Sequence, residues 1–156
     1  MGIEDDIAFL ERVPTLAVLG RDALRIIAIG AESRYVHDGV ALFKEGEDAD
    51  GAYVVQEGAF ELAANGGVLR PVTVRAGALI GELALLTVSA RSVTATAIEP
   101  STVIRITRQL FLKMLEGYPE AARRMRDSIT GRVNDTAREL TRIRSALEGG
   151  APQQRR

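Results

Sequence analysis

The segment of this chain best suited to bind a small anion is Gly81-Glu82-Leu83-Ala84-Leu85-Leu86. Gly81 lets the backbone approach a ligand closely, and we expect a short helix to begin directly after it. The N–H groups in the first turn of a helix carry partial positive charge and point outward, which suits a phosphate. The same field stabilises Glu82 as a carboxylate, which can accept a hydrogen bond from a sugar hydroxyl. The segment therefore predicts a cradle for a sugar phosphate.

Arg91 is the second residue of this region that can carry chemistry, and it opens a run that is typical of a β-strand. Side chains alternate along a strand, so Arg91 shares a face with three small apolar residues, Val93, Ala95 and Ala97. An inward guanidinium requires an anion, which is either Glu82 or a phosphate that accepts two hydrogen bonds. A Glu in a first helical turn and an Arg at the start of a strand are each commonplace. Their combination with Gly81 and an apolar inner face is rarer and favours a binding site.

Hydrophobic periods and glycine spacing indicate which elements position these residues. Two short N-terminal helices are expected, interrupted by Pro14 and with the second capped by Asp22. From Ser33 the chain changes to short β-rich runs separated by glycines, which is typical of an all-β roll. Asn65-Gly66-Gly67 predicts a hairpin that pairs strands near 59–64 and 68–75. The expected fold is mostly β, an antiparallel, jelly-roll-like β-roll with short N-terminal helices and a long C-terminal helix.

The C-terminal part predicts a short helix, a break from Gly117 to Pro119, and then a long helix with one apolar stripe from Ala122 to Leu147. The stripe is roughly seven turns long, which is more than a small roll can cover, so we expect a homodimer through this helix. The expected organisation is one domain over residues 1–150, with N-terminal helices 4–31, roll 33–108, C-terminal helices 109–148, and a disordered tail 151–156.

Composition excludes several classes of site and partner. A net charge of −1 gives the whole molecule no electrostatic reason to bind nucleic acid or an anionic membrane. The absence of cysteine and the single His37 exclude disulfides, thiolate catalysis and the usual metal clusters. The N-terminus lacks the pattern of a signal peptide, and no apolar run reaches the roughly 18 residues that span a bilayer. We therefore expect a cytoplasmic protein without metal or cofactor, and with no nucleic-acid or membrane partner.

The stretch from Val40 to Leu62, together with Gly81 to Ala97, resembles the cyclic nucleotide-binding domain family, which includes the catabolite activator protein and protein kinase A regulatory subunits. The matching motifs are Leu42-Phe43-Lys44-Glu45-Gly46-Glu47 and Ala52-Tyr53-Val54-Val55-Gln56-Glu57-Gly58, with glycines where the family's turns need them, at Gly39, Gly46 and Gly58. The resemblance extends from about Leu16 to Leu147. It implies a β-roll that holds cAMP or cGMP.

By the same resemblance, Gly81 to Ala97 matches the family's phosphate-binding cassette. It implies that Glu82 holds the ribose 2′-hydroxyl, that the N–H groups of Leu83 and Ala84 meet the cyclic phosphate, and that Arg91 neutralises it. Three positions depart from the usual family pattern of Phe, Pro and Ala: they hold Ile80, Ala90 and Val93.

Val93 is the departure that bears on affinity, because it can crowd the phosphate. Ser92 stands where family members use a hydroxyl on the phosphate or on a guanine edge, so it does not choose between cAMP and cGMP. Counting from Pro119 places Thr136 near the purine.

The leading hypothesis is a ligand-responsive sensor that acts without an effector domain of its own, through an unidentified partner protein or its own dimer state. A transcription factor is disfavoured, because the long helix uses nearly all residues after Pro119 and leaves no helix-turn-helix. An enzyme is disfavoured, because no nucleophile and base surround His37. The alternative is a degenerate domain that keeps the fold for protein interaction without binding nucleotide. The presence of both Glu82 and Arg91 speaks against it.

Overall fold

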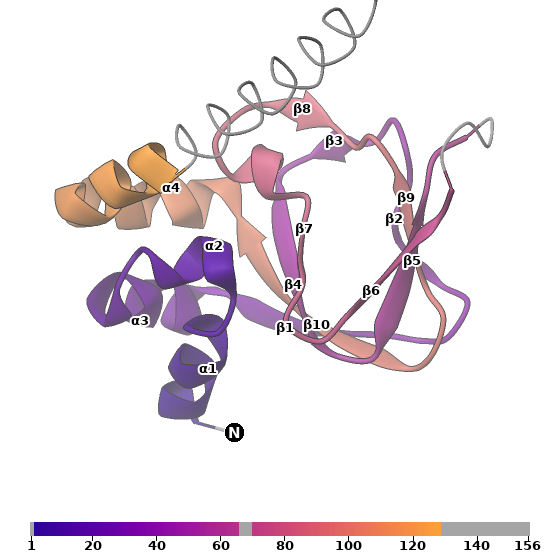
Figure 1. Ribbon diagram of the computed structural model, residues 1–156, viewed down its shortest axis with the longest axis horizontal. Coiled ribbons are helices and arrows are strands. Elements are labelled where there is room, and N and C mark those ends of the chain that lie inside the picture. The colour runs from indigo at the N-terminus through magenta and orange to yellow at the C-terminus, as the bar shows by residue number, and fades with distance from the viewer. Residues whose placement is uncertain (1, 66–69, 129–156) are drawn as a thin grey trace, which may run out of the picture.

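The computed structural model describes residues 2–65 and 70–128, in which a β-roll lies beside a group of helices (Figure 1). Three helices precede the roll: α1 (Ile3–Leu10), α2 (Pro14–Ala17) and α3 (Arg21–Gly30). One helix, α4 (Arg108–Gly117), follows the roll directly, and residues 119–128 are helical again. The expected fold class is therefore confirmed.

The roll consists of short antiparallel strands in two four-stranded sheets and one two-stranded pair. One sheet has the order β1-β10-β4-β7 and the other β2-β9-β5-β6, while β3 pairs with β8. Their bounds are β1 Glu32–Val36, β2 Ala41–Phe43, β3 Asp48–Ala49, β4 Gly51–Glu57, β5 Ala59–Ala63, β6 Val72–Arg75, β7 Leu79–Ile80, β8 Ser89–Ala90, β9 Thr94–Ala97 and β10 Ser101–Thr107. A 3₁₀ helix, η1 (Glu82–Leu85), joins β7 to β8.

The N-terminal segment forms three helices where the sequence predicted two. Pro14 opens α2 instead of only interrupting a helix, because proline fits the first position of a helix, where no N–H is needed. The N-cap of α3 is Gly20, with a φ of 88°, and Asp22 lies inside the first turn. The prediction that Asp22 caps this helix is therefore wrong, although its carboxylate still lies at the favourable end of the helix dipole.

The strand pairing predicted around the glycine-rich turn is present, since β5 and β6 pair antiparallel from Ala59–Arg75 to Leu62–Val72. The turn itself, at residues 66–69, lies outside the described residues. Tyr118 separates α4 from the next helix, near the predicted break. Most of the predicted apolar stripe, including its end at Leu147, also lies outside the described residues, as does the predicted tail 151–156.

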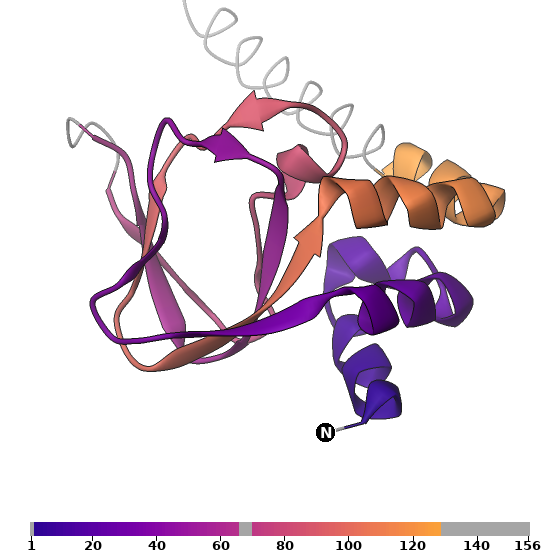
Figure 2. The same ribbon diagram turned by 180° about the vertical axis from the view of Figure 1, so that it is seen from behind.

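Two hydrophobic cores share the central strands β4 and β10. Successive side chains of β4 point to opposite sides of the strand. Ala52 and Val54 therefore pack with the helices, whereas Tyr53 and Val55 pack between the two sheets. Seen from behind, β10 runs straight into α4 (Figure 2). The helices are thus attached to the roll by both packing and chain continuity. None of the helices in the described ranges has the length and apolar character needed to cross a membrane.

Candidate functional site

Gly81 links β7 to η1 and needs to be glycine for two reasons. Its φ of 77° lies in the left-handed region, which residues with a Cβ rarely adopt. A Cβ at this position would also lie 2.5 Å from Nη1 of Arg91. The backbone of the turn therefore lies directly against the guanidinium, as the close approach expected from the sequence requires.

The helix after Gly81 is a single 3₁₀ turn, and part of its N-terminal donor set is already used. The Ala84 N–H donates to the Gly81 carbonyl at 3.1 Å, which closes that turn. Leu83 is 65% exposed, so its apolar side chain stands out from the cassette. Ala84 and Leu85 are buried and anchor the turn to the roll.

Arg91 points inward as predicted, but it does not lie in a strand. The strand β9 begins at Thr94, and Arg91 is instead held by its backbone: its N–H donates to the Glu47 carbonyl at 2.8 Å, and its own carbonyl accepts from Gly46 N–H at 2.8 Å. The prediction of one strand from residue 91 to 97 is therefore corrected to an anchored turn followed by β9. Arg91 is nevertheless buried, with only 6% of the residue exposed.

The Arg91 guanidinium is buried without a full set of hydrogen-bond partners. Its Nε and Nη1 are both buried, and neither has a hydrogen-bond partner among the residues that the structure describes. Burial lowers the pKa of Arg91, while the fields of Tyr53, Asp50 and Glu47 oppose this shift. Leaving a buried cation with unmade hydrogen bonds is costly, so this group is suited to receive an anion.

A cavity of about 320 Å³ lies in front of Arg91. It brings together most of the predicted site residues, namely Gly81, Leu83, Ala84, Arg91, Ser92 and Val93. The other wall residues are Phe43, Ala49, Leu62, Leu79, Ile80, Ser89 and Ala90, most of them apolar. A mainly apolar cavity with one buried cation suits a small molecule that combines an anionic group with an apolar ring.

Glu82 and Thr136 are the two predicted site residues that the structure does not place in this cavity. Glu82 is exposed and lines a neighbouring cavity of about 410 Å³, whose walls include Leu85, Phe111 and Met125. Leu83 lines both cavities, so η1 forms the partition between them. Thr136 lies outside the described residues.

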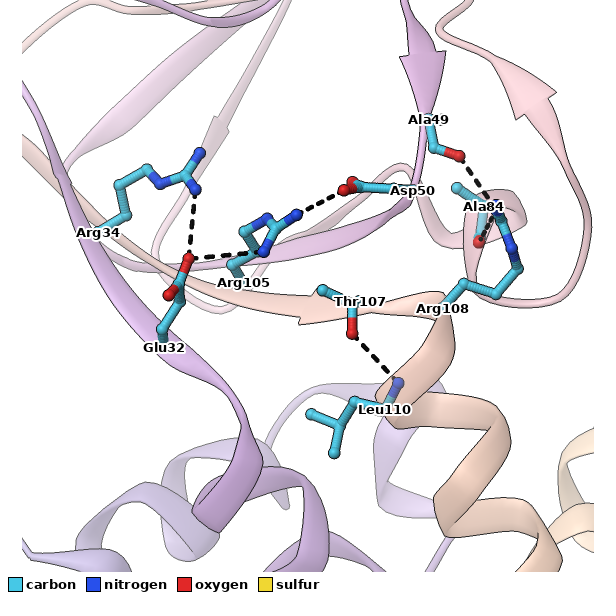
Figure 3. Close-up of polar contacts among 9 residues, drawn as sticks. All are labelled: Glu32, Arg34, Ala49, Asp50, Ala84, Arg105, Thr107, Arg108 and Leu110. Carbon is cyan, nitrogen blue, oxygen red and sulfur yellow. Dashed lines mark hydrogen bonds and ion pairs between the residues drawn. The ribbon is translucent and has the colours of Figure 1, made fainter.

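Asp50, one of the acids whose field acts on Arg91, is paired with another arginine, Arg105. Arg105 bonds Asp50 and lies 3.5 Å from Glu32, which also pairs with Arg34 (Figure 3). Burial alone would lower the pKa of Arg105, but Asp50 and the Tyr53 hydroxyl raise it above its ordinary value. Asp50 is thus committed to Arg105, whose charge is satisfied within the protein.

Arg108 is a residue of the site that the sequence reasoning missed. From the first turn of α4, its Nη1 donates to the backbone carbonyls of Ala49 at 3.0 Å and Ala84 at 2.9 Å (Figure 3). The same Nη1 lies 3.0 Å from the Thr87 carbonyl, a third acceptor. It therefore joins β3, η1 and the loop after η1 to α4. A signal was available in the sequence, because a cation in the first turn of a helix opposes the helix dipole and needs another reason to be there.

Known proteins resemble this chain over the same region. Residues 33–118 match the cyclic nucleotide-binding domain family. An NTE family protein of Mycobacterium bovis is 35% identical over 111 residues, which are 70% of this chain and 19% of that protein. A cAMP-dependent protein kinase regulatory subunit of Yarrowia lipolytica is 33% identical over 107 residues, 69% of this chain and 28% of that protein.

Among solved structures, a cyclic nucleotide-binding-like protein of Brucella abortus is 37% identical, with a TM-score of 0.63 over 72% of this chain and 98% of that chain. The chain thus spans less than a third of the two curated relatives, 19% and 28% of their lengths.

Proposed function

Because the chain belongs to the cyclic nucleotide-binding domain family, which matches residues 33–118, we propose that the cavity beside Arg91 binds a cyclic nucleotide monophosphate. The observation that carries the proposal is the buried guanidinium of Arg91, whose Nε and Nη1 have no hydrogen-bond partner within residues 2–65 and 70–128. A cyclic phosphate can accept two parallel hydrogen bonds from such a group. The relative from Yarrowia lipolytica is a cAMP-dependent regulatory subunit, which supports the same ligand class.

In this proposal the residues of the cassette contact different parts of the ligand. Arg91 neutralises the phosphate, and Gly81 lets the backbone of η1 come close to it. The N–H groups of Leu83 and Ala84 complete the phosphate contacts, so the Ala84 N–H turns from the Gly81 carbonyl to the ligand. Glu82 takes a ribose hydroxyl, and this requires η1 to move its exposed carboxylate toward the Arg91 cavity.

We propose that the base is adenine or guanine, because the residues expected to contact it do not favour one purine over the other. Ser92 is exposed at the cavity wall, where its hydroxyl can serve either the phosphate or a guanine edge. Val93 is half-buried in the same wall and limits the space beside the phosphate. Thr136 remains a proposed purine contact.

The output of binding is proposed to be a change in the position of the C-terminal helices. We propose a regulatory role without catalysis, in the cytoplasm, through a partner protein or a homodimer formed by the long C-terminal helix that the sequence predicts. Closure of that helix over the bound nucleotide would couple occupancy to its docking. A ligand shifts such an equilibrium only through contacts that differ between the two states, and η1 offers them because it lines both cavities.

A second candidate function is a degenerate domain that uses the fold for protein interaction alone. One observation favours it: Glu82 lines the neighbouring cavity and not the one that contains Arg91. In that case the exposed Leu83 would serve a protein contact.

A thermal-shift and calorimetric series with cAMP, cGMP and the non-cyclic control 5′-AMP separates the two candidates. Binding to the folded state at 100 times Kd stabilises by about 2.7 kcal/mol, so we expect the Tm to rise by about 5–10 °C with a cyclic nucleotide. The open 5′-AMP should shift the Tm less. If neither cyclic nucleotide changes the Tm or produces heat at millimolar concentration, the binding proposal is wrong and the degenerate domain is favoured.

A further inference from the structure

The buried guanidinium of Arg91 rests on two aromatic side chains. Its Cζ lies 4.3 Å from the ring centroid of Phe43 and 5.6 Å from that of Tyr53. The two rings stack on each other at 5.9 Å with an interplanar angle of 29°. Both rings are nearly fully buried.

The acids around Arg91 are engaged with other groups. Asp50 and Glu47 are the carboxylates whose fields raise the pKa of Arg91. Asp50 bonds the side chain of Arg105, and the Glu47 carboxylate accepts from the Lys44 N–H at 2.9 Å. Both carboxylates are thus engaged elsewhere, while the two aromatic rings lie directly against this cation.

We propose that Phe43 and Tyr53 are positioning residues, which hold the Arg91 guanidinium in place before a ligand arrives and so raise the affinity for an anion. An aromatic face attracts a cation electrostatically without accepting its N–H groups, unlike a carboxylate. The in-plane donors Nε and Nη1 thus keep their hydrogen bonds for the ligand, since no group in the described part of the chain accepts them. This geometry explains how an arginine can be ordered and buried while its N–H groups stay available to a ligand.

The two rings that contact Arg91 come from different sheets of the roll. Phe43 ends β2 in one sheet, and Tyr53 lies in β4 of the other, opposite Arg105 in β10. Phe43 also lines the cavity itself. Because the guanidinium lies against both of the stacked rings, a shift of Arg91 would disturb these contacts.

The affinity part of this inference rests on the proposed function, and Phe43→Leu tests it against Phe60→Leu. Phe60 belongs to the same core cluster and is also fully buried, but it neither lines the cavity nor contributes a ring to Arg91. We expect Phe43→Leu to weaken cyclic nucleotide binding about tenfold, as loss of a desolvated cation–π contact and of ordering predicts. Phe60→Leu should change the affinity less than threefold. Equal affinities of the two variants in calorimetric titration would overturn the proposal.

A second measurement needs no nucleotide. The Tm of the empty protein is compared for Phe43→Leu and Phe60→Leu, each made in the wild type and in Arg91→Met. If the ring of Phe43 acts on the cation, Phe43→Leu should lower the Tm by about 2–4 °C less in the Arg91→Met background. The loss caused by Phe60→Leu should be the same in both backgrounds.

Equal losses for Phe43→Leu in the two backgrounds would show a role in packing alone and overturn the inference. If either leucine variant does not fold, Phe43→Met and Phe60→Met replace the pair, because methionine fills a core with a flexible chain and has no ring. Absence of nucleotide binding by the wild type would refute the proposed function, while the comparison of Tm values still decides the role of Phe43.

Discussion

Arg91 and Arg105 both lie beside Tyr53, yet their charges are answered in different ways. Arg105 bonds Asp50 and lies near Glu32, and its pKa is raised. Arg91 is more deeply buried, has aromatic faces where Arg105 has acids, and its pKa is lowered. A structural arginine can therefore be told apart from one that is prepared for a ligand by the groups that surround its charge. The guanidinium of Arg105 pairs with acids of the protein, whereas the donors of Arg91 stay available to a ligand.

Arg91→Leu should have the largest effect, because it removes the arginine whose donors are available to a ligand. Loss of charge-assisted hydrogen bonds worth roughly 1.5–3 kcal/mol each should lower the affinity for a cyclic nucleotide by at least tenfold to a hundredfold. The empty variant should melt no lower than the wild type, because leucine suits the apolar surroundings and a desolvated cation is removed. Calorimetric titration and Tm on one preparation measure both effects. A large loss of stability with unchanged binding would contradict a phosphate role for Arg91.

Arg108→Met should have the next largest effect, on stability instead of binding. Three carbonyls, of Ala49, Ala84 and Thr87, lose their shared donor. Because Arg108 is only half-buried, water replaces part of the loss, and we expect unfolding to become easier by about 1–2 kcal/mol. Urea denaturation measures this change.

The matched control for this variant is Arg75→Met, which removes an arginine that is 70% exposed and paired with Glu99 at 3.4 Å. An exposed pair of this kind contributes about 0–1 kcal/mol. Hydrogen exchange of residues 82–87 should also become faster in Arg108→Met alone. Equal stability of the two variants would mean that Arg108 does not hold η1.

Asp50→Asn should have a minor effect, and it tests whether Asp50 serves Arg105 alone. It weakens the main partner of Arg105, and since the Asp50 side chain is 61% exposed, we expect a loss of about 0.5–1 kcal/mol in chemical denaturation. Nucleotide affinity should change less than threefold, because Asp50 is committed to Arg105 and not to Arg91. A loss of affinity as large as that of Arg91→Leu would show that Asp50 belongs to the binding machinery.

The sequence predicted the roll and the inward direction of Arg91 because both depend on local spacing. Glycines separate the strands, and the small residues Ala95 and Ala97 define an inner face that extends back to Arg91. The same alternation predicted a strand that begins too early, because the pattern of side chains carries no information about backbone hydrogen bonds. In the structure, the backbone of Arg91 bonds to Glu47 and Gly46, and the chain turns there.

Contacts between segments that lie far apart in the chain could not be predicted from the sequence. Phe43 and Tyr53 come from different sheets, and nothing in the spacing of either residue places its ring under Arg91. The position of Glu82 depends on how η1 rotates, because a shift of one residue in so short a helix moves a side chain from one cavity to the other. Arg108 was visible only as a cation at an unfavourable helix end.

The central strand β4 contributes to both hydrophobic cores, with Ala52 and Val54 on the side of the helices and Tyr53 and Val55 on the side of the sheets. Neither core can therefore melt while the other stays intact, because the loss of β4 removes a wall from both. The helices and the roll form one cooperative unit over the described residues. A ligand that stabilises only the Arg91 side of the roll consequently protects the helices as well, and heat should unfold both in a single transition.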